Sequence, residues 1–261
     1  MANTVTLHYT QQGQGMPLVL LHGYPFSSAI WHEQQQRLSD HYRVITPDLR
    51  GHGQSPAPLG VYEMETMARD VFALLDSLRI EKAAIMGHSM GGYATLAAWR
   101  IAPERFLALG LIASHAAADS PERLRQRAQL VEQVSAQGSK PVADLMIPLV
   151  FAPGVPADEP IVEQARNLIL NTKPDGIIGT LKGMAARPDS TPILPSINVP
   201  ALIMVGENDQ LIPLSEADSM AAAMPNSTLV TIENAGHMPM LEQPQATTLA
   251  IRNFLGQLST A

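Results

Sequence analysis

Short hydrophobic runs alternate with amphipathic stretches along most of this chain, and the two patterns predict different elements. Residues 18–21 are apolar without polar alternation, which is typical of a strand buried on both faces of a parallel sheet. Together with strand-like patterns elsewhere, the predicted strands are residues 4–10, 18–21, 43–46, 83–86 and 107–113. The predicted helices between them are residues 27–38, 64–78 and 90–101. This alternation indicates βαβ units and a mostly parallel sheet flanked by helices.

The alternation stops after about residue 114. Residues 115–190 predict successive helices separated by Pro and Gly, with no strand among them. The alternation then resumes, with strands at 201–205 and 228–232 and helices at 215–224 and 245–258. We therefore expect one α/β core formed by residues 1–114 and 191–261. Residues 115–190 would be inserted as a helical lid over that core.

The composition of the chain excludes several classes of partner and of chemistry. Of the 261 residues, 46% are hydrophobic and 16% charged, which allows a large core. The formal net charge of −7, with scattered Lys and Arg, argues against a nucleic-acid partner. The sequence has no cysteine, which excludes disulfides, thiolate metal sites and a cysteine nucleophile. No apolar stretch approaches the roughly 20 residues that span a bilayer, and the first residues lack the pattern of a signal peptide, so we expect a cytoplasmic protein without a membrane partner.

The strongest chemical signal is the segment GHSMG at residues 87–91, followed by Gly92. It lies between a predicted strand and a predicted helix, which is the context of a nucleophile elbow: a sharp turn whose flanking positions must be small. Ser89 would project from the tip of this turn as a nucleophile. Without its flanking strand and helix, the same pattern would be an ordinary glycine-rich turn.

A serine hydroxyl needs a base and an acid that orients the base. His237 follows the last predicted strand, in a loop at the carboxyl edge of the sheet, and is the predicted base. The loop after the strand 201–205 offers two carboxylates, Glu207 and Asp209. Asp209 lies further beyond the strand end, from where its side chain can reach the His237 loop, and is the preferred acid. The order serine, acid, histidine along the chain fits this assignment.

The oxyanion of an acyl-transfer reaction requires two backbone N–H donors. Met90, directly after the proposed nucleophile, would supply one. The loop that follows strand 18–21 would supply the other, because Gly23 lets its backbone approach the serine and leaves the Tyr24 N–H as the donor. Taken alone, this loop is equally compatible with a simple connection between a strand and a helix.

Five ordered segments together carry a resemblance to a known family. They are HGYP at 22–25, DLRGHG at 48–53, GHSMGG at 87–92, GEND at 206–209 and AGH at 235–237. In this order they resemble the landmarks of the α/β-hydrolase superfamily, over residues 18–258 apart from the helical insertion, which resembles the cap of that family. The chain is similar to small carboxylesterases and to the 3-oxoadipate enol-lactonase-like group. Dehalogenases and most epoxide hydrolases of this fold use an Asp where this chain has Ser89.

The predicted function is a serine carboxylesterase that hydrolyses small-molecule esters of short to medium acyl chains through an acyl-enzyme. Alternatives are an enol-lactonase or C–C bond hydrolase with the same triad and, less favoured, a ligand receptor with little turnover.

Met146 and Met184 in the insertion and Met238 beside the base are candidate substrate contacts, although core packing is the commoner role of methionine. His115, at the junction of the sheet and the insertion, could contact substrate, but a hinge or surface role is favoured. Zinc, dinucleotide and phosphate-loop motifs are missing, so the chemistry requires no metal and no cofactor. The oligomeric state stays open.

Overall fold

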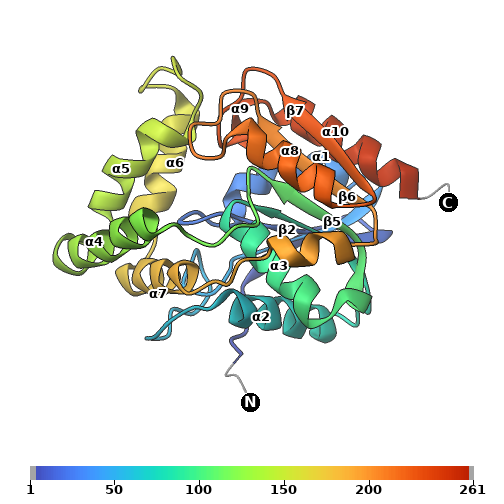
Figure 1. Ribbon diagram of the computed structural model, residues 1–261, viewed down its shortest axis with the longest axis horizontal. Helices are drawn as coiled ribbons and strands as arrows, with labels where there is room; N and C mark the ends of the chain where they lie inside the picture. The colour runs from blue at the N-terminus through green and yellow to red at the C-terminus, as the bar shows by residue number, and fades with distance from the viewer. Residues whose placement is uncertain (1–3, 259–261) are drawn as a thin grey trace.

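The computed structural model describes residues 4–258, and over these residues seven strands form one sheet in the order β1-β3-β2-β4-β5-β6-β7 (Figure 1). The strands are β1 (Tyr9–Gln12), β2 (Met16–Leu21), β3 (Tyr42–Pro47), β4 (Ala83–His88), β5 (Phe106–Ile112), β6 (Ala201–Gly206) and β7 (Ser227–Ile232). β1 pairs antiparallel with β3, and every other neighbouring pair is parallel. This confirms the predicted mostly parallel sheet.

The start of the chain differs from the prediction. A strand was expected over residues 4–10, but β1 begins only at Tyr9. Two backbone N–H groups before it donate to side chains and not to a neighbouring strand: the Val5 N–H donates to Asp70 Oδ1 and the His8 N–H donates to Ser55 Oγ. The predicted helix over residues 27–38 is also divided, into a 3₁₀ turn (Ser28–Trp31) and helix α1 (His32–Leu38).

Helices flank the sheet and bury its central strands. The helix α1 packs against α10 (Pro244–Leu258), and α2 (Met64–Ser77) packs against α3 (Met90–Ile101). The helix α8 (Leu214–Ala223) contacts β6 and β7, and the short α9 (Pro239–Glu242) precedes α10. Every residue of β4 is buried, as expected of a strand covered on both faces. Within residues 4–258, no helix has both the length and the apolar character needed to cross a membrane.

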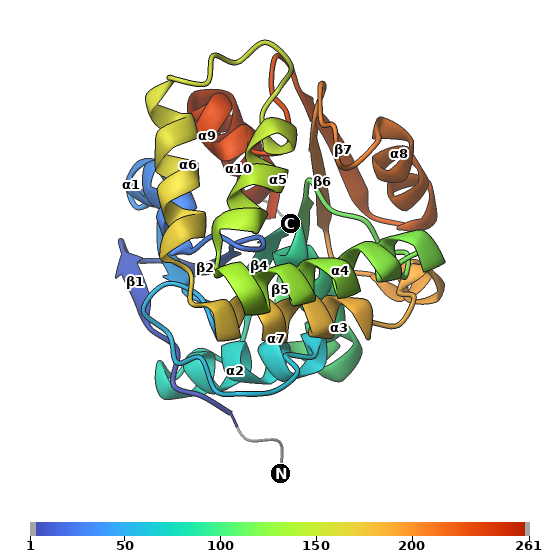
Figure 2. The same cartoon turned by 90° about the vertical axis from the view of Figure 1, so that its left-hand side faces the viewer.

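Residues 115–190, here called the cap segment, contain four helices within the described part of the chain. These are α4 (Pro121–Gln137), α5 (Lys140–Val150), α6 (Pro160–Asn171) and α7 (Pro174–Ala185). Each has a proline in its first turn, where the missing N–H costs no intrahelical bond. Figure 1 shows the four helices at one end of the molecule, and Figure 2, viewed from that end, shows them in front of the strands. That the cap segment is a unit separate from the core stays a prediction.

Candidate active site

Ser89 occupies a sharp turn between β4 and α3. Its φ of 49° and ψ of −114° lie in a region that non-glycine residues rarely adopt, so the turn is strained. The Ser89 N–H donates to Ile112 O at 2.8 Å, which fixes the turn to the end of β5. A Cβ atom on Gly87 would lie 2.1 Å from the Gly91 carbonyl, and one on Gly91 would lie 2.6 Å from Leu21 O. The small residues on both sides of Ser89 are therefore required by packing, as the sequence pattern predicts.

Asp209 and His237 form a hydrogen-bonded pair at the same edge of the sheet. Asp209 lies in the loop after β6, and its Oδ2 is 2.9 Å from Nδ1 of His237, in the loop after β7. Both side chains are nearly inaccessible, with exposed fractions of 2% for His237 and 1% for Asp209. The other oxygen, Asp209 Oδ1, accepts the N–H groups of Leu211 and Ile212. With Nδ1 donating to Asp209, His237 keeps Nε2 free to accept a proton.

The ionised form of Asp209 is stabilised by its surroundings. Burial by itself would raise the pKa of this carboxyl group, but the His237 ring and the amide hydrogen bonds outweigh burial and hold the pKa below its usual range. Glu207, the alternative acid, lies elsewhere in the loop: its Oε2 accepts the Asn234 N–H at 3.1 Å. This contact gives Glu207 a structural role in the loop that leads to His237.

Glu242 holds the His237 loop from the other side. Its Oε1 accepts the N–H groups of Gly236 and Met238, the two neighbours of His237, at 2.9 and 3.2 Å. Its Oε2 accepts the Ala152 N–H from the cap segment at 2.8 Å. Burial raises the pKa of Glu242 despite these three donors. One carboxylate therefore ties the histidine loop to the cap segment, a role that the sequence analysis did not identify.

His88 lies beneath the site and supports His237. The His88 Nε2–H donates to the His237 backbone carbonyl at 2.8 Å, and the two rings lie 4.9 Å apart between centroids. Burial, followed by the neighbouring His237 ring, lowers the pKa of His88 to about 3, so His88 is neutral. Gly23 packs against it so closely that a Cβ there would lie 2.5 Å from His88 Nδ1.

The loop that carries the predicted oxyanion donor is fixed by His22. The His22 Nδ1–H donates to Gly23 O at 2.9 Å, and its Nε2 accepts the Leu49 N–H at 2.9 Å. Tyr24, the next residue, lines the same cavity as Ser89. Met90 is the first residue of α3, so its N–H has no intrahelical acceptor. The structure therefore places both backbone positions on the elements predicted for them, and their role as oxyanion donors stays a prediction.

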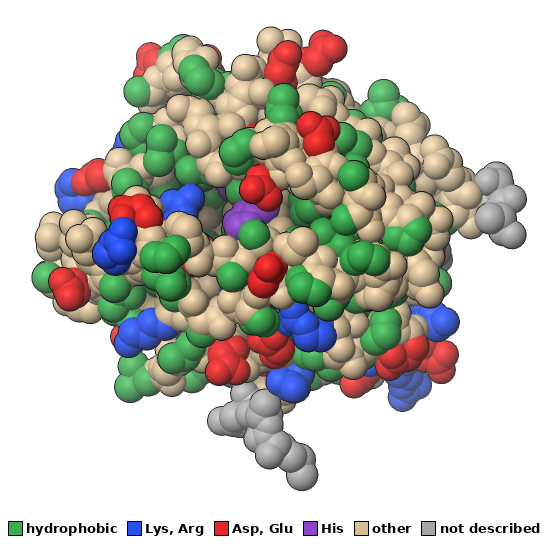
Figure 3. All heavy atoms as spheres, viewed as in Figure 1, with side chains coloured by type: hydrophobic (Ala, Val, Ile, Leu, Met, Phe, Trp, Pro, Cys, Tyr) green, Lys and Arg blue, Asp and Glu red, His purple; other side chains and the backbone are tan. Residues whose placement is uncertain are grey.

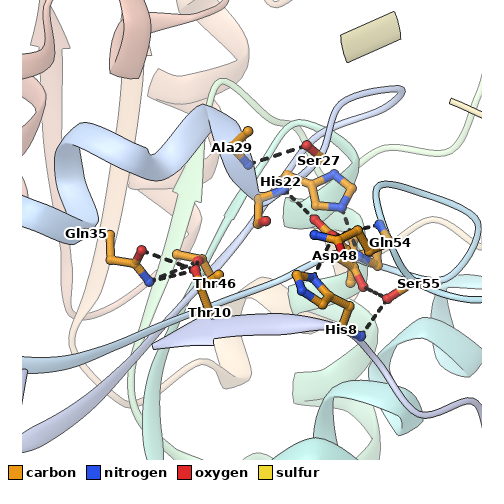
Figure 4. Close-up of polar contacts among 12 residues, drawn as sticks. His8, Thr10, His22, Ser27, Ala29, Gln35, Thr46, Asp48, Gln54 and Ser55 are labelled. Atoms are coloured by element: carbon orange, nitrogen blue, oxygen red, sulfur yellow. Dashed lines mark hydrogen bonds and ion pairs between the residues drawn. The ribbon is translucent and has the colours of Figure 1, made fainter. Parts of the chain in front are cut away.

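Asp48 connects the segments around this loop (Figure 4). Its Oδ1 accepts the Ser28 N–H, and its Oδ2 accepts the Gln54 N–H and lies 3.0 Å from His8 Nδ1. The Asp48 carbonyl accepts the Ser55 hydroxyl at 2.6 Å. A buried carboxylate thus joins the beginning of the chain, the loop after β2 and the loop after β3, and keeps the backbone near Ser89 in one arrangement.

A cavity of about 600 Å³ opens at this edge of the sheet between the core and the cap segment. Figure 3 shows a hollow on this side of the molecule, with a histidine side chain beside it and basic and acidic side chains interspersed around it. Ser89, His237 and Tyr24 line the cavity from the core, and Met146 and Met184 line it from the cap segment. The role of the two methionines as substrate contacts stays a prediction. The residues that line it are Tyr24, Ser89, Tyr93, His115, Arg123, Gln126, Arg127, Gln129, Leu130, Gln133, Leu145, Met146, Leu149, Leu181, Met184, Gln210, Leu211, Ile212 and His237.

One expectation about a single residue needs correction. Met238 is fully buried in the hydrophobic core and does not line the cavity, so its side chain is not a substrate contact. Its neighbour His237 faces the cavity, whereas Met238 packs inward. His115, for which a hinge or surface role was favoured, lines the cavity, and its Nε2 lies 2.8 Å from Tyr93 Oη. Among residues 4–258, no group of three or more His, Asp or Glu side chains is arranged to hold a metal ion.

The sequence profile described as "Alpha/beta hydrolase family" matches residues 18–250. The chain belongs to the alpha/beta hydrolase family. Among curated relatives, 3-oxoadipate enol-lactonase 2 of Acinetobacter baylyi is 32% identical, with 96% of this chain and 93% of the relative covered. A pimeloyl-[acyl-carrier protein] methyl ester esterase of Aliivibrio fischeri is 30% identical over 97% of this chain and 99% of its own.

Solved structures agree with this membership. A thermophilic esterase from Thermogutta terrifontis superimposes with a TM-score of 0.95 at 38% identity, covering 97% of this chain and 94% of its own. An enol-lactonase from Burkholderia xenovorans superimposes with a TM-score of 0.90 at 29% identity and covers 97% of both chains. The resemblance seen in the sequence is confirmed. This alpha/beta hydrolase has esterases and enol-lactonases among its relatives.

Proposed function

We propose that this alpha/beta hydrolase is a serine carboxylesterase for short to medium acyl esters. The observation that carries the proposal is the meeting of three separate segments in one cavity. Ser89, on a strained turn, and His237 both line that cavity, and Nδ1 of His237 is bonded to the buried Asp209 at 2.9 Å. A nucleophile, a base and an orienting acid are the parts that acyl transfer to a serine requires.

In the proposed reaction, Ser89 Oγ attacks the ester carbonyl carbon while His237 Nε2 accepts the hydroxyl proton. The carbonyl oxygen becomes an oxyanion, to which the Tyr24 and Met90 N–H groups donate. His237 then donates its proton to the leaving alcohol, and the acyl group stays on Ser89. Water attacks this acyl-enzyme by the same route and releases the carboxylic acid. Asp209 holds His237 in the tautomer that presents Nε2 to Ser89.

An enol-lactonase is the second candidate, and two observations favour it. A curated 3-oxoadipate enol-lactonase is 32% identical to this chain, and an enol-lactonase structure superimposes with a TM-score of 0.90. A lactone is a cyclic ester, so the same residues would open it, with the leaving alcohol retained in the product. A C–C bond hydrolase and a receptor with little turnover have no such support. A cytoplasmic location stays a prediction.

The test is steady-state hydrolysis of 4-nitrophenyl butyrate beside a panel of lactones, including an enol-lactone. The proposal expects turnover of the ester and a loss on the order of 10⁶ in kcat for Ser89→Ala. Ser135→Ala, a change on the exposed face of α4, is the matched control and should keep full activity. A much higher kcat/KM for the enol-lactone would favour the second candidate. Ester turnover that survives in Ser89→Ala would contradict both.

A further inference from the structure

Positive charge gathers at the cap end of the cavity, although the chain as a whole carries a formal net charge of −7. The charged side chains that line the cavity, within residues 4–258, are Arg123 and Arg127, and no carboxylate lines it. Both arginines come from α4, four residues apart, which places them on one face of the helix.

The charge of Arg127 is only partly neutralised. Its guanidinium bonds to Asp119 through Nε and Nη2, but Asp119 also accepts from Nη1 of Arg187 at 2.7 Å. One carboxylate, 3% exposed, thus serves two guanidinium groups, 14% exposed in Arg127 and 4% in Arg187. One positive charge remains in excess in a region screened from water.

Arg127 also retains donor capacity toward the cavity. Its Nη1 contacts the Met184 sulfur at 3.5 Å. A thioether is a weak acceptor, so this contact does little to satisfy the two N–H groups of that nitrogen. A carboxylate in the cavity would be a far stronger acceptor for the same group.

The Tyr24 hydroxyl gives an independent indication of a ligand. Tyr24 lines the cavity and is only 6% exposed, yet its Oη has no hydrogen-bond partner among the described residues. An unpaired buried hydroxyl is costly, so a partner is expected when the cavity is filled. Burial raises the pKa of Tyr24 and the Arg127 charge opposes that rise, so the hydroxyl keeps its proton and lies within electrostatic reach of Arg127.

His115, which also lines the cavity, adds no charge to it. Burial, followed by the Arg187 charge, lowers the pKa of His115 to about 4, so its ring is neutral at pH 7. Its Nε2 is engaged with the Tyr93 hydroxyl at 2.8 Å. The electrostatic character of this end of the cavity is therefore set by the arginines.

We propose that Tyr24, Arg123 and Arg127 form an anion subsite and that the ester substrate carries a carboxylate which this subsite binds. This inference rests on the proposed ester hydrolysis and narrows its substrate class to acidic esters, such as the half-esters of dicarboxylic acids. The carboxylate would accept hydrogen bonds from the Tyr24 hydroxyl and Arg127 Nη1 while the ester group lies at Ser89. Arg123 would add to the positive potential at the same end.

The experiment compares substrates matched in size and different in charge. Mono-4-nitrophenyl adipate carries a carboxylate at the end of a six-carbon acyl chain, and 4-nitrophenyl hexanoate carries a methyl group there. A second pair, 4-butanoyloxybenzoate and its methyl ester, places the carboxylate on the leaving group. The proposal expects kcat/KM to be about 10- to 100-fold higher for the acid of at least one pair, as expected for a charged hydrogen bond.

Single-residue variants then test which side chains cause the preference for acidic esters. Arg127→Gln and Tyr24→Phe should each lower the ratio of acidic to neutral kcat/KM by about 10-fold, mainly through KM. Arg125→Gln is the matched control, since Arg125 is exposed on the same helix and pairs with Glu122, and it should keep the ratio. If Arg127→Gln fails to fold because Asp119 loses a partner, Arg123→Gln and Tyr24→Phe still test the subsite.

Adipate itself provides a readout that does not depend on its turnover. It should inhibit hydrolysis of 4-nitrophenyl acetate competitively, and its inhibition constant should be higher for Tyr24→Phe than for the natural chain. Equal kcat/KM within both pairs would overturn the anion subsite while leaving ester hydrolysis intact. The same would follow if 4-nitrophenyl 6-hydroxyhexanoate, which ends in a neutral hydroxyl, were hydrolysed with the same kcat/KM as mono-4-nitrophenyl adipate. Absence of turnover with all four esters would instead reject the proposed function.

Discussion

Buried neutral histidines make this protein sensitive to mild acid. His52 and His88 are fully buried, and burial, followed in each case by a neighbouring histidine, lowers their pKa values to about 3. His22 and Asp48 face His52, whereas His237, Asp209 and His22 face His88. Both rings must stay neutral in the folded protein, since a proton would charge a group without access to water.

The magnitude follows from linkage between proton binding and folding. An unfolded histidine has a pKa of about 6.5 and is almost fully protonated at pH 5, whereas the folded His52 and His88 remain neutral there. Unfolding therefore takes up about one proton per ring, and the free energy of unfolding falls as the pH falls. Between pH 7 and pH 5 each ring should cost the folded state about 2 kcal/mol, or about 4 kcal/mol for the two. That is a large part of the 5–15 kcal/mol typical of a folded domain.

The assay is urea denaturation at pH 7 and pH 5 for the natural chain and for His88→Gln. Glutamine can still donate to the His237 carbonyl but cannot take up a proton, so the variant should lose about 2 kcal/mol less on acidification. His41→Gln, at an exposed ring, is the matched control and should behave as the natural chain does. The reasoning is refuted if His88→Gln loses as much stability between the two pH values as the natural chain.

Three further predictions concern the site. Asp209→Asn should lower kcat by about 10⁴ because His237 loses the partner that fixes its tautomer, whereas Glu207→Gln should have a far smaller effect; the reverse order in steady-state kinetics would exchange the two roles. Glu242→Gln places an NH₂ group against a backbone N–H, so the free energy of unfolding measured in urea should fall by about 2 kcal/mol. An unchanged free energy of unfolding would show that the three contacts of Glu242 contribute little. A cavity of about 600 Å³ favours small acyl groups, so kcat/KM should be far higher for 4-nitrophenyl butyrate than for the palmitate; preference for palmitate, or a rise in rate at an emulsion interface, would reject this.

Local sequence patterns predicted the elements that short-range physics determines. The turn around Ser89 could be predicted because Gly87 and Gly91 leave room that no larger residue would, and α3 begins and ends where its apolar spacing indicates. Asp209 could be preferred over Glu207 because parallel strands bring their following loops to one edge, where the more distant residue of the loop reaches His237.

Features that depend on contacts between distant segments could not be predicted in the same way. Residues 4–8 alternate like a strand, but Asp70 and Ser55 take their backbone donors. Met238 follows a residue that lines the cavity, and only the path of the loop decides that its side chain points into the core. The spacing of Arg123 and Arg127 places both on one helical face, but the packing of α4 against α5 and α7 decides which face borders the cavity.

The central claim is that Ser89 is the nucleophile, and covalent labelling tests it most directly. A fluorophosphonate should react with the folded protein and lose reactivity after heat unfolding, because the activation of Ser89 depends on the assembled site. Trypsin cleavage after Lys82 and Arg100 releases Ser89 in one peptide that also contains Tyr93 and Thr95, and fragment masses distinguish the three hydroxyls. The account predicts the label on Ser89 and no labelling of Ser89→Ala. Labelling of Ser89→Ala at the full rate, or a label on another residue of the natural chain, would contradict it.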